Sequence, residues 1–406
     1  MTTPGVRQDQ STAYEPAVRT LLPGVALIAV TFGLARYGYG LLLPEMRSEF
    51  SLSEGLAGLI ASATYAAYLV ANVAVVVLMH RFGAKITIGL AAALAAGGMV
   101  IMASASDPAV LTLGVLVAGA ASGLALPPYS GLVSSRVEPR RRDRVWPAIS
   151  SGTGWGVALA GPIAIVAGDR WRLVWAAFVV AAVGVGIAAV LLAPPREGGS
   201  ARMPQLSPSW FICPKSRPLL VSAVLLGLGS AVWWAFCVDA LREAGHDPTT
   251  ARIVYAVCGA AGILATLGGG ALGRWGLRRG YLASCLLLAG SLALLGLAIG
   301  HLATATAAAI LFGVFYNGVL AAQGIWSSRV FAGHPVAGLA AVNVAVTLGT
   351  LIGPALAGLG ADRFGYGTAL VAAAAVVALA VPFCPPGARR QRRLAEHRCR
   401  AAPVRP

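Results

Sequence analysis

Long apolar segments follow one another along nearly the whole chain, and their length limits the folds that this sequence can adopt. The chain has 406 residues, of which 57% are hydrophobic and only 11% are charged. A bilayer core about 30 Å thick is crossed by roughly 20 apolar residues in an α-helix. The sequence therefore predicts an all-α membrane protein and excludes a soluble domain, whose surface needs more charge.

The segmentation of the chain predicts 12 transmembrane helices arranged as two six-helix bundles. The stretch 194–217 is rich in proline, serine and charge, and it is typical of a cytoplasmic linker. We expect a cytoplasmic N-terminal segment at 1–19, a first bundle at 20–193, this linker at 194–217, a second bundle at 218–384 and a basic cytoplasmic tail at 385–406. The spans are expected at about 20–44, 55–79, 84–105, 108–134, 146–168, 171–193, 218–241, 250–273, 278–300, 302–328, 335–361 and 365–384.

The distribution of basic residues predicts the orientation of these helices. With the N-terminus placed in the cytoplasm, the cytoplasmic segments hold 24 of the 31 Lys and Arg residues and the opposite segments hold six. Cytoplasmic loops of membrane proteins carry such an excess, so both termini are expected in the cytoplasm. The formal net charge of +16 is thereby explained by topology and by contact with anionic membrane lipids, and no nucleic-acid partner is expected.

The two halves of the chain repeat one another. The letters SSRV occur at Ser134–Val137 and again at Ser327–Val330, an offset of 193 residues. A Gly-Pro pair occurs at Gly161–Pro162 and again at Gly353–Pro354, an offset of 192. Six spans in each half give both halves the same orientation, which is the arrangement of secondary transporters built from two parallel repeats.

The loop motifs resemble those of the major facilitator superfamily. That family carries a Gly-x-x-x-Asp-Arg-x-Gly-Arg-Lys type loop between helices 2 and 3. The corresponding stretch VVLMHRFGAK keeps Arg81, Gly83 and Lys85, whereas His80 replaces the aspartate and Val76 the first glycine. The glycine permits a tight turn, and the cations meet the negative end of a helix dipole. The resemblance implies gating roles for these matching residues.

The second half carries its own copies of these features. The stretch GGALGRWGLRR keeps Arg274, Gly276 and Arg278, again without the acid. The stretch GTGWGVALAGP, which ends in Gly161 and Pro162, resembles the fifth-helix pattern of exporters in the superfamily. We expect gating roles for these residues and for the repeated pair Gly353 and Pro354. The fourth-helix arginine that the superfamily often links to proton coupling is not present in VAGAASGLALPPYSG.

The first apolar segment contains one charged residue, Arg36. Its surroundings, FGLARYGYGLLLPEM, resemble the first helix of the YbfB/YjiJ-like bacterial branch of the superfamily, which implies transport of a small solute. The residues that carry this likeness are Phe32, Gly33, Arg36, Tyr37, Tyr39, Leu43, Pro44 and Met46.

An arginine near the middle of a span costs about 2.5–3.5 kcal/mol on insertion scales. No carboxylate lies near the middle of the predicted spans. The acid expected to approach Arg36 across the bundle interface is Asp239. Two readings follow: a structural arginine bonded to backbone carbonyls, or a cation that faces a cavity and binds an anion.

At regular helical spacing, Arg36 shares one face with other residues of its segment. These are Phe32, Gly33, Tyr39, Gly40 and Leu43, and they predict an aromatic wall beside one cation. Polar or aromatic residues of other spans are further candidates for substrate binding, although packing between helices explains each of them as well. The full set of predicted substrate-binding residues is Arg36, Phe32, Tyr39, Tyr65, Asn72, Tyr129, Trp155, Trp233, Asn317, Gln323 and Asn343.

We expect a secondary active transporter that moves a small organic solute across the bacterial inner membrane by alternating access, with an anionic solute and proton coupling as the finer expectations. Asp239 and Glu45 are the candidates for proton coupling. The alternative is a multidrug or sugar exporter that binds neutral or amphipathic solutes, with Arg36 structural. An enzyme is not expected, because the spans hold no paired carboxylates, nucleophile–base set or metal cluster. We expect no cofactor, no metal and a monomer.

Overall fold

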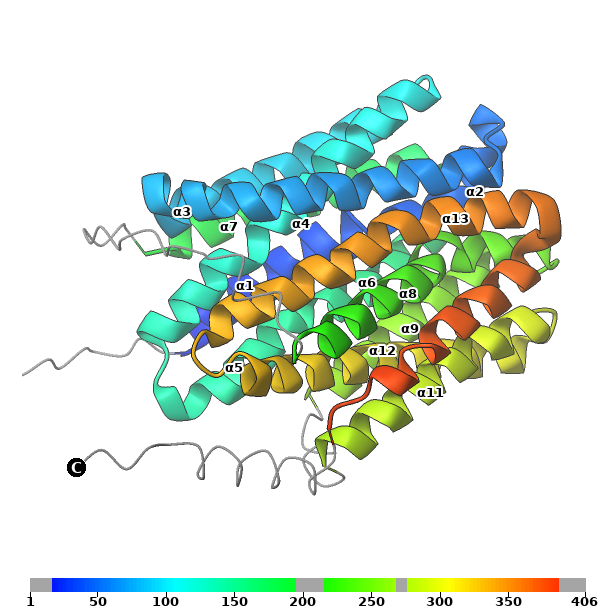
Figure 1. The fold of residues 1–406 in the computed structure, drawn as a ribbon. Helices are drawn as coiled ribbons and strands as arrows, with labels where there is room; N and C mark the ends of the chain where they lie inside the picture. The colour runs from blue at the N-terminus through cyan, green and yellow to red at the C-terminus, as the bar shows by residue number, and fades with distance from the viewer. Residues whose placement is uncertain (1–16, 195–214, 268–275, 387–406) are drawn as a thin grey trace, which may run out of the picture.

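The computed structural model describes residues 17–194, 215–267 and 276–386, and these residues form helices joined by short turns (Figure 1). The first half of the chain, residues 17–194, begins with a helix that is interrupted by a stretch of wider, π-helical turns. Its elements are α1 (Ala17–Ile28), the π-helix η1 (Ala29–Leu34), α2 (Gly38–Phe50), α3 (Glu54–Ala103), α4 (Pro108–Arg136), α5 (Pro139–Ser150), α6 (Gly152–Ala167) and α7 (Trp171–Leu192).

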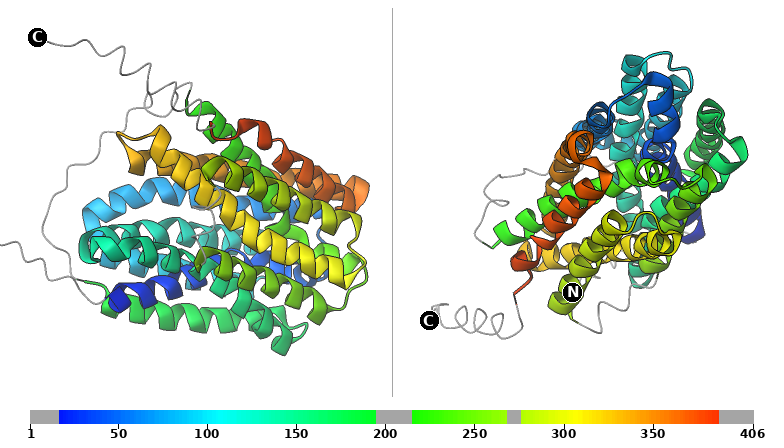
Figure 2. Two further views of the ribbon diagram at one scale, coloured as in Figure 1. Left: turned by 90° about the horizontal axis from the view of Figure 1, so that it is seen from below. Right: turned by 90° about the vertical axis from the view of Figure 1, so that its right-hand side faces the viewer.

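The second half, residues 215–386, has long helices of similar apolar composition. They are α8 (Arg217–Glu243), α9 (Pro248–Leu267), α11 (Leu277–Leu297), α12 (Leu302–Val330), α13 (Pro335–Ala378) and the short 3₁₀-helix η3 (Val381–Phe383). The helices of both halves lie side by side, with their axes aligned along one long direction of the molecule (Figure 2). Ten helices of the described chain are long and apolar enough to cross a membrane.

Two of these helices contain a break at a glycine. Gly83 in α3 has φ 77° and Gly365 in α13 has φ 76°, values that favour glycine because it has no Cβ. Glu54, which begins α3, pairs with Arg47, while Ala105, just after α3, accepts a hydrogen bond from Arg172 at the same end of the molecule. The chain therefore reverses direction at Gly83, as the sequence predicted for this loop.

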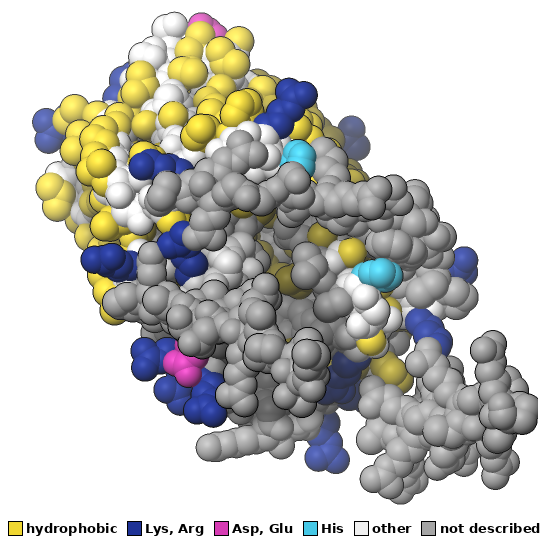
Figure 3. Space-filling model, turned by 90° about the vertical axis from the view of Figure 1, so that its left-hand side faces the viewer, with side chains coloured by type: hydrophobic (Ala, Val, Ile, Leu, Met, Phe, Trp, Pro, Cys, Tyr) yellow, Lys and Arg dark blue, Asp and Glu magenta, His cyan; other side chains and the backbone are white. Residues whose placement is uncertain are grey.

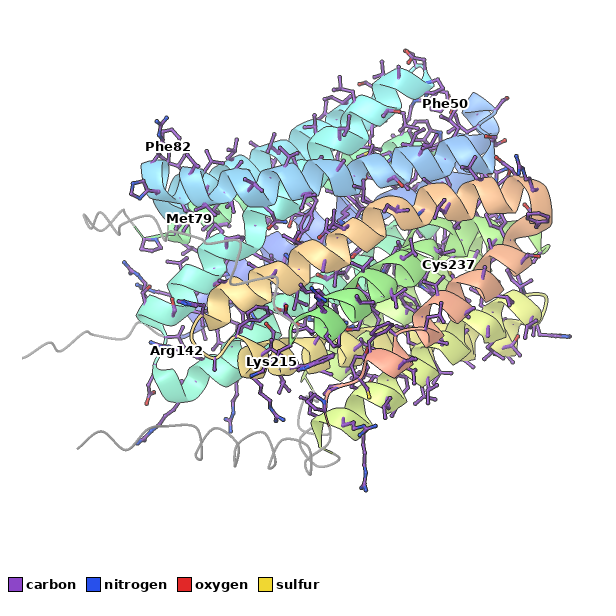
Figure 4. All side chains as sticks on the ribbon, in the orientation of Figure 1. Phe50, Met79, Phe82, Arg142, Lys215 and Cys237 are labelled. Carbon is purple, nitrogen blue, oxygen red and sulfur yellow. The ribbon has the colours of Figure 1, made fainter. Side chains whose placement is uncertain are left out.

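The molecule has two recognisable ends (Figure 4). Phe50 and Cys237 lie toward one end, and Phe82, Arg142 and Lys215 lie toward the other. We call the first the paired end, because the ion pairs between the two halves that involve Arg47, Asp239, Glu45 and Arg252 lie there. We call the second the α5 end.

The two halves meet mainly along three pairs of helices: α3 with α13, α6 with α9, and α2 with α8. Each pair approaches closely at a glycine. A Cβ on Gly58 would overlap the carbonyl oxygen of Pro354, and one on Gly40 would overlap that of Trp234. A Cβ on Gly154 would lie 2.7 Å from a backbone oxygen of α9. Small residues at such contacts let helices pack backbone to backbone, the usual means of helix association in lipid.

Several predicted boundaries differ from the structure, and two of the differences fall near the first and fifth spans. The span expected at 146–168 is divided at Ser151 into α5 and α6, and the span expected at 20–44 continues to Phe50. The predicted residue Arg274 lies outside the described residues, as do most of the N-terminal segment, the linker and the basic tail. The division into two bundles at the predicted boundaries stays a prediction.

Candidate functional site

Arg36 lies where the first helix is wound more loosely than an α-helix. The N–H groups of Ala35 and Tyr37 bond to the carbonyls of Val30 and Phe32, each five residues back, at 2.8 and 3.0 Å. Such π-type turns are rare and are frequent at functional sites. They bring Arg36 into the interior, where its side chain is 8% exposed.

The guanidinium of Arg36 is surrounded by aromatic rings. Its Cζ lies 4.3 Å from the ring centre of Tyr68 and 4.5 Å from that of Tyr65, both on α3. The ring centres of Phe32 and Tyr37 lie at 5.5 and 5.7 Å. All four distances fall within the range of cation–π attraction, so the rings stabilise the buried charge.

Hydrogen-bonding partners for this guanidinium are scarce. Nη1 donates one long bond of 3.5 Å to the hydroxyl of Ser122 on α4, and Nε is buried with no acceptor among the described residues. The titratable groups that interact with Arg36 are the tyrosines 37, 65, 68 and 316, and none is a carboxylate. A buried cation with unused donors is costly unless an anion or water completes it.

The second half of the chain faces this cation with further rings. Trp234 of α8 stacks on Tyr37, with the ring centres 4.3 Å apart and the planes inclined by 25°. Trp234 also makes edge contacts with Phe312 and Tyr316 of α12, at 5.4 and 5.7 Å. Tyr255 of α9 donates a 3.0 Å hydrogen bond to the Tyr37 carbonyl. The aromatic wall thus crosses from one half to the other.

Some predicted substrate-binding residues come together here. Phe32 and Tyr65 contact Arg36 directly, as does Tyr68. Asn343 of α13 reaches the same place, because its Nδ2 donates a 3.0 Å hydrogen bond to the Tyr68 hydroxyl. Trp233 is one ring further away and stacks on Phe312 at 4.4 Å.

Other predicted residues are engaged elsewhere. Asn317 donates to the carbonyl of Gly313 in its own helix, and Gln323 donates to Ser222 of α8. Asn72 donates to the carbonyl of Tyr68, one turn earlier in its own helix. Their amides therefore bond within or between helices.

Tyr129 and Trp155 lie away from Arg36. Tyr129 lines a small pocket with Arg19, Thr20 and Pro23 of α1. Trp155 is 45% exposed, on a face of α6 that it shares with the exposed Leu159 and Val166. The expectation that Trp155 faces the interior is not met, because the glycines of α6 occupy the faces that contact η1 and α9.

The predicted single face of the first helix is wrong. Tyr39 donates to the carbonyl of Ala57 on α3, whereas Gly33 packs against Gly156 on α6 and Gly40 packs on α8. The reason is the π-helical winding, which breaks the regular spacing on which the prediction relied.

Asp239 does not approach Arg36, contrary to expectation. It forms an ion pair with Arg47 and accepts a hydrogen bond from Tyr366, at the paired end. Arg47 also pairs with Glu54, and Asp362 of α13 accepts a 2.9 Å hydrogen bond from the N–H of Gly55. Because Arg47, Glu54 and Gly55 belong to the first half and the others to the second, this cluster joins the two halves.

Glu45 forms a second bond between the halves. Arg252 of α9 is 2% exposed, and its Nη2 donates to Glu45 at 2.8 Å and to the Gly168 carbonyl at 3.0 Å. Its Nη1 donates to the Ala164 carbonyl at 3.0 Å. Arg252 is therefore held by three acceptors of the first half.

The residues with predicted gating roles lie at both ends. Gly83 and Gly276 have positive φ values of 77° and 76°, a backbone conformation that favours glycine. Lys85 lies near the first of these turns, and Arg81 and Arg278 are exposed. Gly161 packs on Arg252 and Ala256 of α9, Gly353 packs on Leu228 of α8, and the Pro354 carbonyl meets Gly58. Pro162 lies within α6, which continues past it.

Sequence reasoning missed several residues of this site. Ser122 and Tyr316 lie in spans where a single hydroxyl or ring gives no signal above packing, and Tyr37 was placed outside the predicted face. Arg252 was counted only among the six basic residues on the side opposite the cytoplasm. Its position only four residues into α9, within a buried face, could be found only from the structure.

The comparisons with known proteins agree with this architecture. The sequence pattern of a family described as "Uncharacterised MFS-type transporter YbfB" matches residues 28–383. The "Uncharacterized transporter YgaY" of Escherichia coli O157:H7 is 32% identical over 214 residues, which cover 50% of this chain and 53% of that protein. The corresponding protein of Escherichia coli strain K12 is 33% identical over 166 residues, 39% of this chain and 41% of that protein. The chain thus spans about half the length, or less, of the curated relatives it matches.

Solved structures share the fold at low sequence identity. The nucleoside transporter NupG superposes with a TM-score of 0.72 at 15% identity, over 90% of this chain and 98% of that one. A bacterial homolog of the human lysosomal transporter Spinster, in an inward-facing and unoccupied conformation, gives a TM-score of 0.74 at 16% identity, over 90% and 96% of the two chains. With a family match from residue 28 to residue 383 and this fold, the chain belongs to the YbfB-type transporters of the major facilitator superfamily.

Proposed function

We propose that this protein is a secondary active transporter that moves a small organic anion across the bacterial inner membrane, with Arg36 as the anion-binding residue. One observation carries the proposal: Arg36 is buried, caged by four rings and unpaired with any carboxylate of the described residues. Charges inside membranes are costly and usually serve function, and planar donors of arginine suit an anion.

The proposed topology has 12 spans with both termini in the cytoplasm. The breaks at Gly83 and Gly365 support it, because α3 and α13 then each supply two spans and add to the ten long helices. Lys and Arg side chains gather at the α5 end, where few acidic side chains are seen (Figure 3). The positive-inside rule assigns this end to the cytoplasm and the paired end to the outside.

Alternating access needs two ends that open in turn around a central site. The paired end is closed by the ion pairs of Arg47 with Asp239 and of Arg252 with Glu45. With the paired end assigned to the outside, the proposed cycle has its outer side shut in this conformation. Opening it must break both pairs, so these four residues form the outer gate of the proposed cycle.

Proton coupling is part of the proposal, with Asp239 and Glu45 as its candidate carriers. Each carboxylate is paired with an arginine of the opposite half, so protonation would weaken the outer gate. Uptake driven by an imposed pH gradient in proteoliposomes tests this step. Asp239→Asn should abolish the response to the gradient while exchange of solute across equal pH persists.

The alternative function is a multidrug or sugar exporter in which Arg36 is structural. The cation–π contacts with Tyr65 and Tyr68 favour this alternative, because they can stabilise a purely structural arginine. In that case neutral or lipophilic solutes would bind the aromatic wall, and Arg36→Gln would damage folding more than selectivity.

A thermal-shift screen of the purified protein distinguishes the two functions. Small carboxylates, sugars and lipophilic cations are tested on the wild type, on Arg36→Gln and on Arg363→Gln, an exposed arginine that serves as the control. The proposal expects carboxylates to stabilise the wild type and the control but not Arg36→Gln. Equal stabilisation of a folded Arg36→Gln by neutral or cationic solutes would favour the exporter.

A further inference from the structure

The charge around Arg36 limits the charge of its ligand. Among the described residues the site holds one permanent cation, and the titratable groups that interact with it are tyrosines on the Arg36 segment, α3 and α12. A single negative charge neutralises this cation, whereas a second one would enter a buried site with no further cation among its contacts. Burial of such an unpaired charge is strongly unfavourable, so a monoanion fits best.

The geometry of the guanidinium limits the shape of the anionic group. The guanidinium carbon lies 4.5 and 4.3 Å from the ring centres of Tyr65 and Tyr68, so these rings are neighbours that supply no negative charge. Nε has no acceptor and Nη1 has one at 3.5 Å. A flat acceptor with two oxygens in one plane can bind the N–H edge of a guanidinium with two parallel hydrogen bonds, as carboxylates do.

The body of the ligand is limited by the wall that faces Arg36. Tyr37 belongs to the first half and Trp234 to the second, and their rings stack at 4.3 Å. Nε1 of Trp234 is buried without an acceptor among the described residues. In the proposed cycle the two halves separate, which would part this stack and expose one face of each ring to a flat aromatic ligand.

We propose that the substrate is an aromatic monocarboxylate whose carboxylate binds the N–H edge of Arg36 and whose ring stacks between Tyr37 and Trp234. This inference rests on the proposed function and goes beyond it by naming the class of the substrate. A ligand bound in this way would contact both halves, because Arg36 in the first half holds its carboxylate and the ring lies between Tyr37 of the first half and Trp234 of the second.

Isothermal titration of the purified protein with matched probes tests the proposal. Benzoate is compared with cyclohexanecarboxylate, which has the same charge and similar size but no π-system, and with benzamide, which has the ring without the charge. Stacking on two ring faces should make benzoate bind at least about fivefold more tightly than cyclohexanecarboxylate. Benzamide should bind more weakly than either.

Variants separate this inference from the proposed function. Trp234→Leu should weaken benzoate and leave cyclohexanecarboxylate unchanged, while Trp234→Phe should retain the preference. If cyclohexanecarboxylate binds the wild type as tightly as benzoate, and both need Arg36, the aromatic class is wrong and the anion transporter stands. If benzoate binds Arg36→Gln and wild type equally, the proposed function itself fails. Should Trp234→Leu not fold, the comparison of the two probes on the wild type and on Trp234→Phe still decides.

Discussion

The side-chain amide of Asn343 donates a 3.0 Å hydrogen bond to the hydroxyl of Tyr68, whose ring lies 4.3 Å from the guanidinium carbon of Arg36. This bond joins α13 of the second half to α3 of the first half beside the proposed site. An anion that binds Arg36 therefore lies beside a contact between the halves, and the hydrogen bond holds the Tyr68 ring in place next to the cation.

Tyr68→Phe and Asn343→Ala should each weaken benzoate binding by about three- to tenfold, because each removes the same hydrogen bond of about 1 kcal/mol. The double variant should bind no more weakly than the more affected single variant, since coupled residues are not additive. Calorimetric titration of all four proteins measures this cycle. Thr347→Val, which loses a bond to the Asn343 carbonyl within the same helix, is the control. Additive effects of the two changes would mean that the bond is not made in solution.

Arg252→Met should lower the free energy of unfolding by about 3 kcal/mol, because it removes the cation that pairs with the largely buried carboxylate of Glu45 and two bonds to backbone carbonyls. The double variant Glu45→Gln with Arg252→Met should recover part of this loss, since no unpaired charge remains. Denaturant unfolding in detergent measures both. Arg170→Met changes an exposed arginine at the same end and should have little effect. A single variant as stable as this control would show that Arg252 does not hold the halves together.

Gly58→Val should hold the paired end open, because a side chain there overlaps the carbonyl of Pro354 and prevents α3 from closing on α13. The buried thiol of Cys237 at that end reports the change, in a background where the other cysteines are alanine. Its reaction with an impermeant thiol reagent should become faster in Gly58→Val. Gly97→Val on the same helix is the control, since a Cβ there meets nothing within 4 Å. An unchanged rate in both proteins would contradict closure at Gly58.

Gly33→Ala should abolish carboxylate binding and lower stability, because its methyl group would lie 2.6 Å from the carbonyl carbon of Gly156 and push the π-helix away from α6. The aromatic cage around Arg36 depends on that position. Thermal shift with benzoate measures both properties. Gly184→Ala lies in open space and should behave as wild type. Normal binding by Gly33→Ala would show that the cage does not need this contact.

Much of the fold could be predicted from the sequence, because the length and apolar content of the segments leave few options in a membrane. The reversals at Gly83 and Gly365 follow the same logic: a 50-residue apolar helix is far longer than one span, so it must turn back at a residue that tolerates positive φ. The division at Ser151 was missed, because the small residues from Gly152 onward were interpreted as part of one glycine-rich helix rather than as a helix start.

The candidate site could be predicted in part. Arg36 and its neighbours Phe32 and Tyr65 were found from charge, helical spacing and aromatic character. The π-helical turns could not be found, because their hydrogen bonds depend on packing against other helices. For the same reason the sequence did not show that Asp239 lies at the paired end with Arg47 rather than beside Arg36.

Uptake of radiolabelled benzoate by proteoliposomes at neutral pH, corrected with protein-free vesicles, tests the central claim most directly. The wild type should show saturable uptake that excess unlabelled benzoate suppresses, and Arg36→Gln, reconstituted to the same level, should show none above the correction. Saturable uptake of equal rate by Arg36→Gln would contradict the role of Arg36 in binding the transported anion.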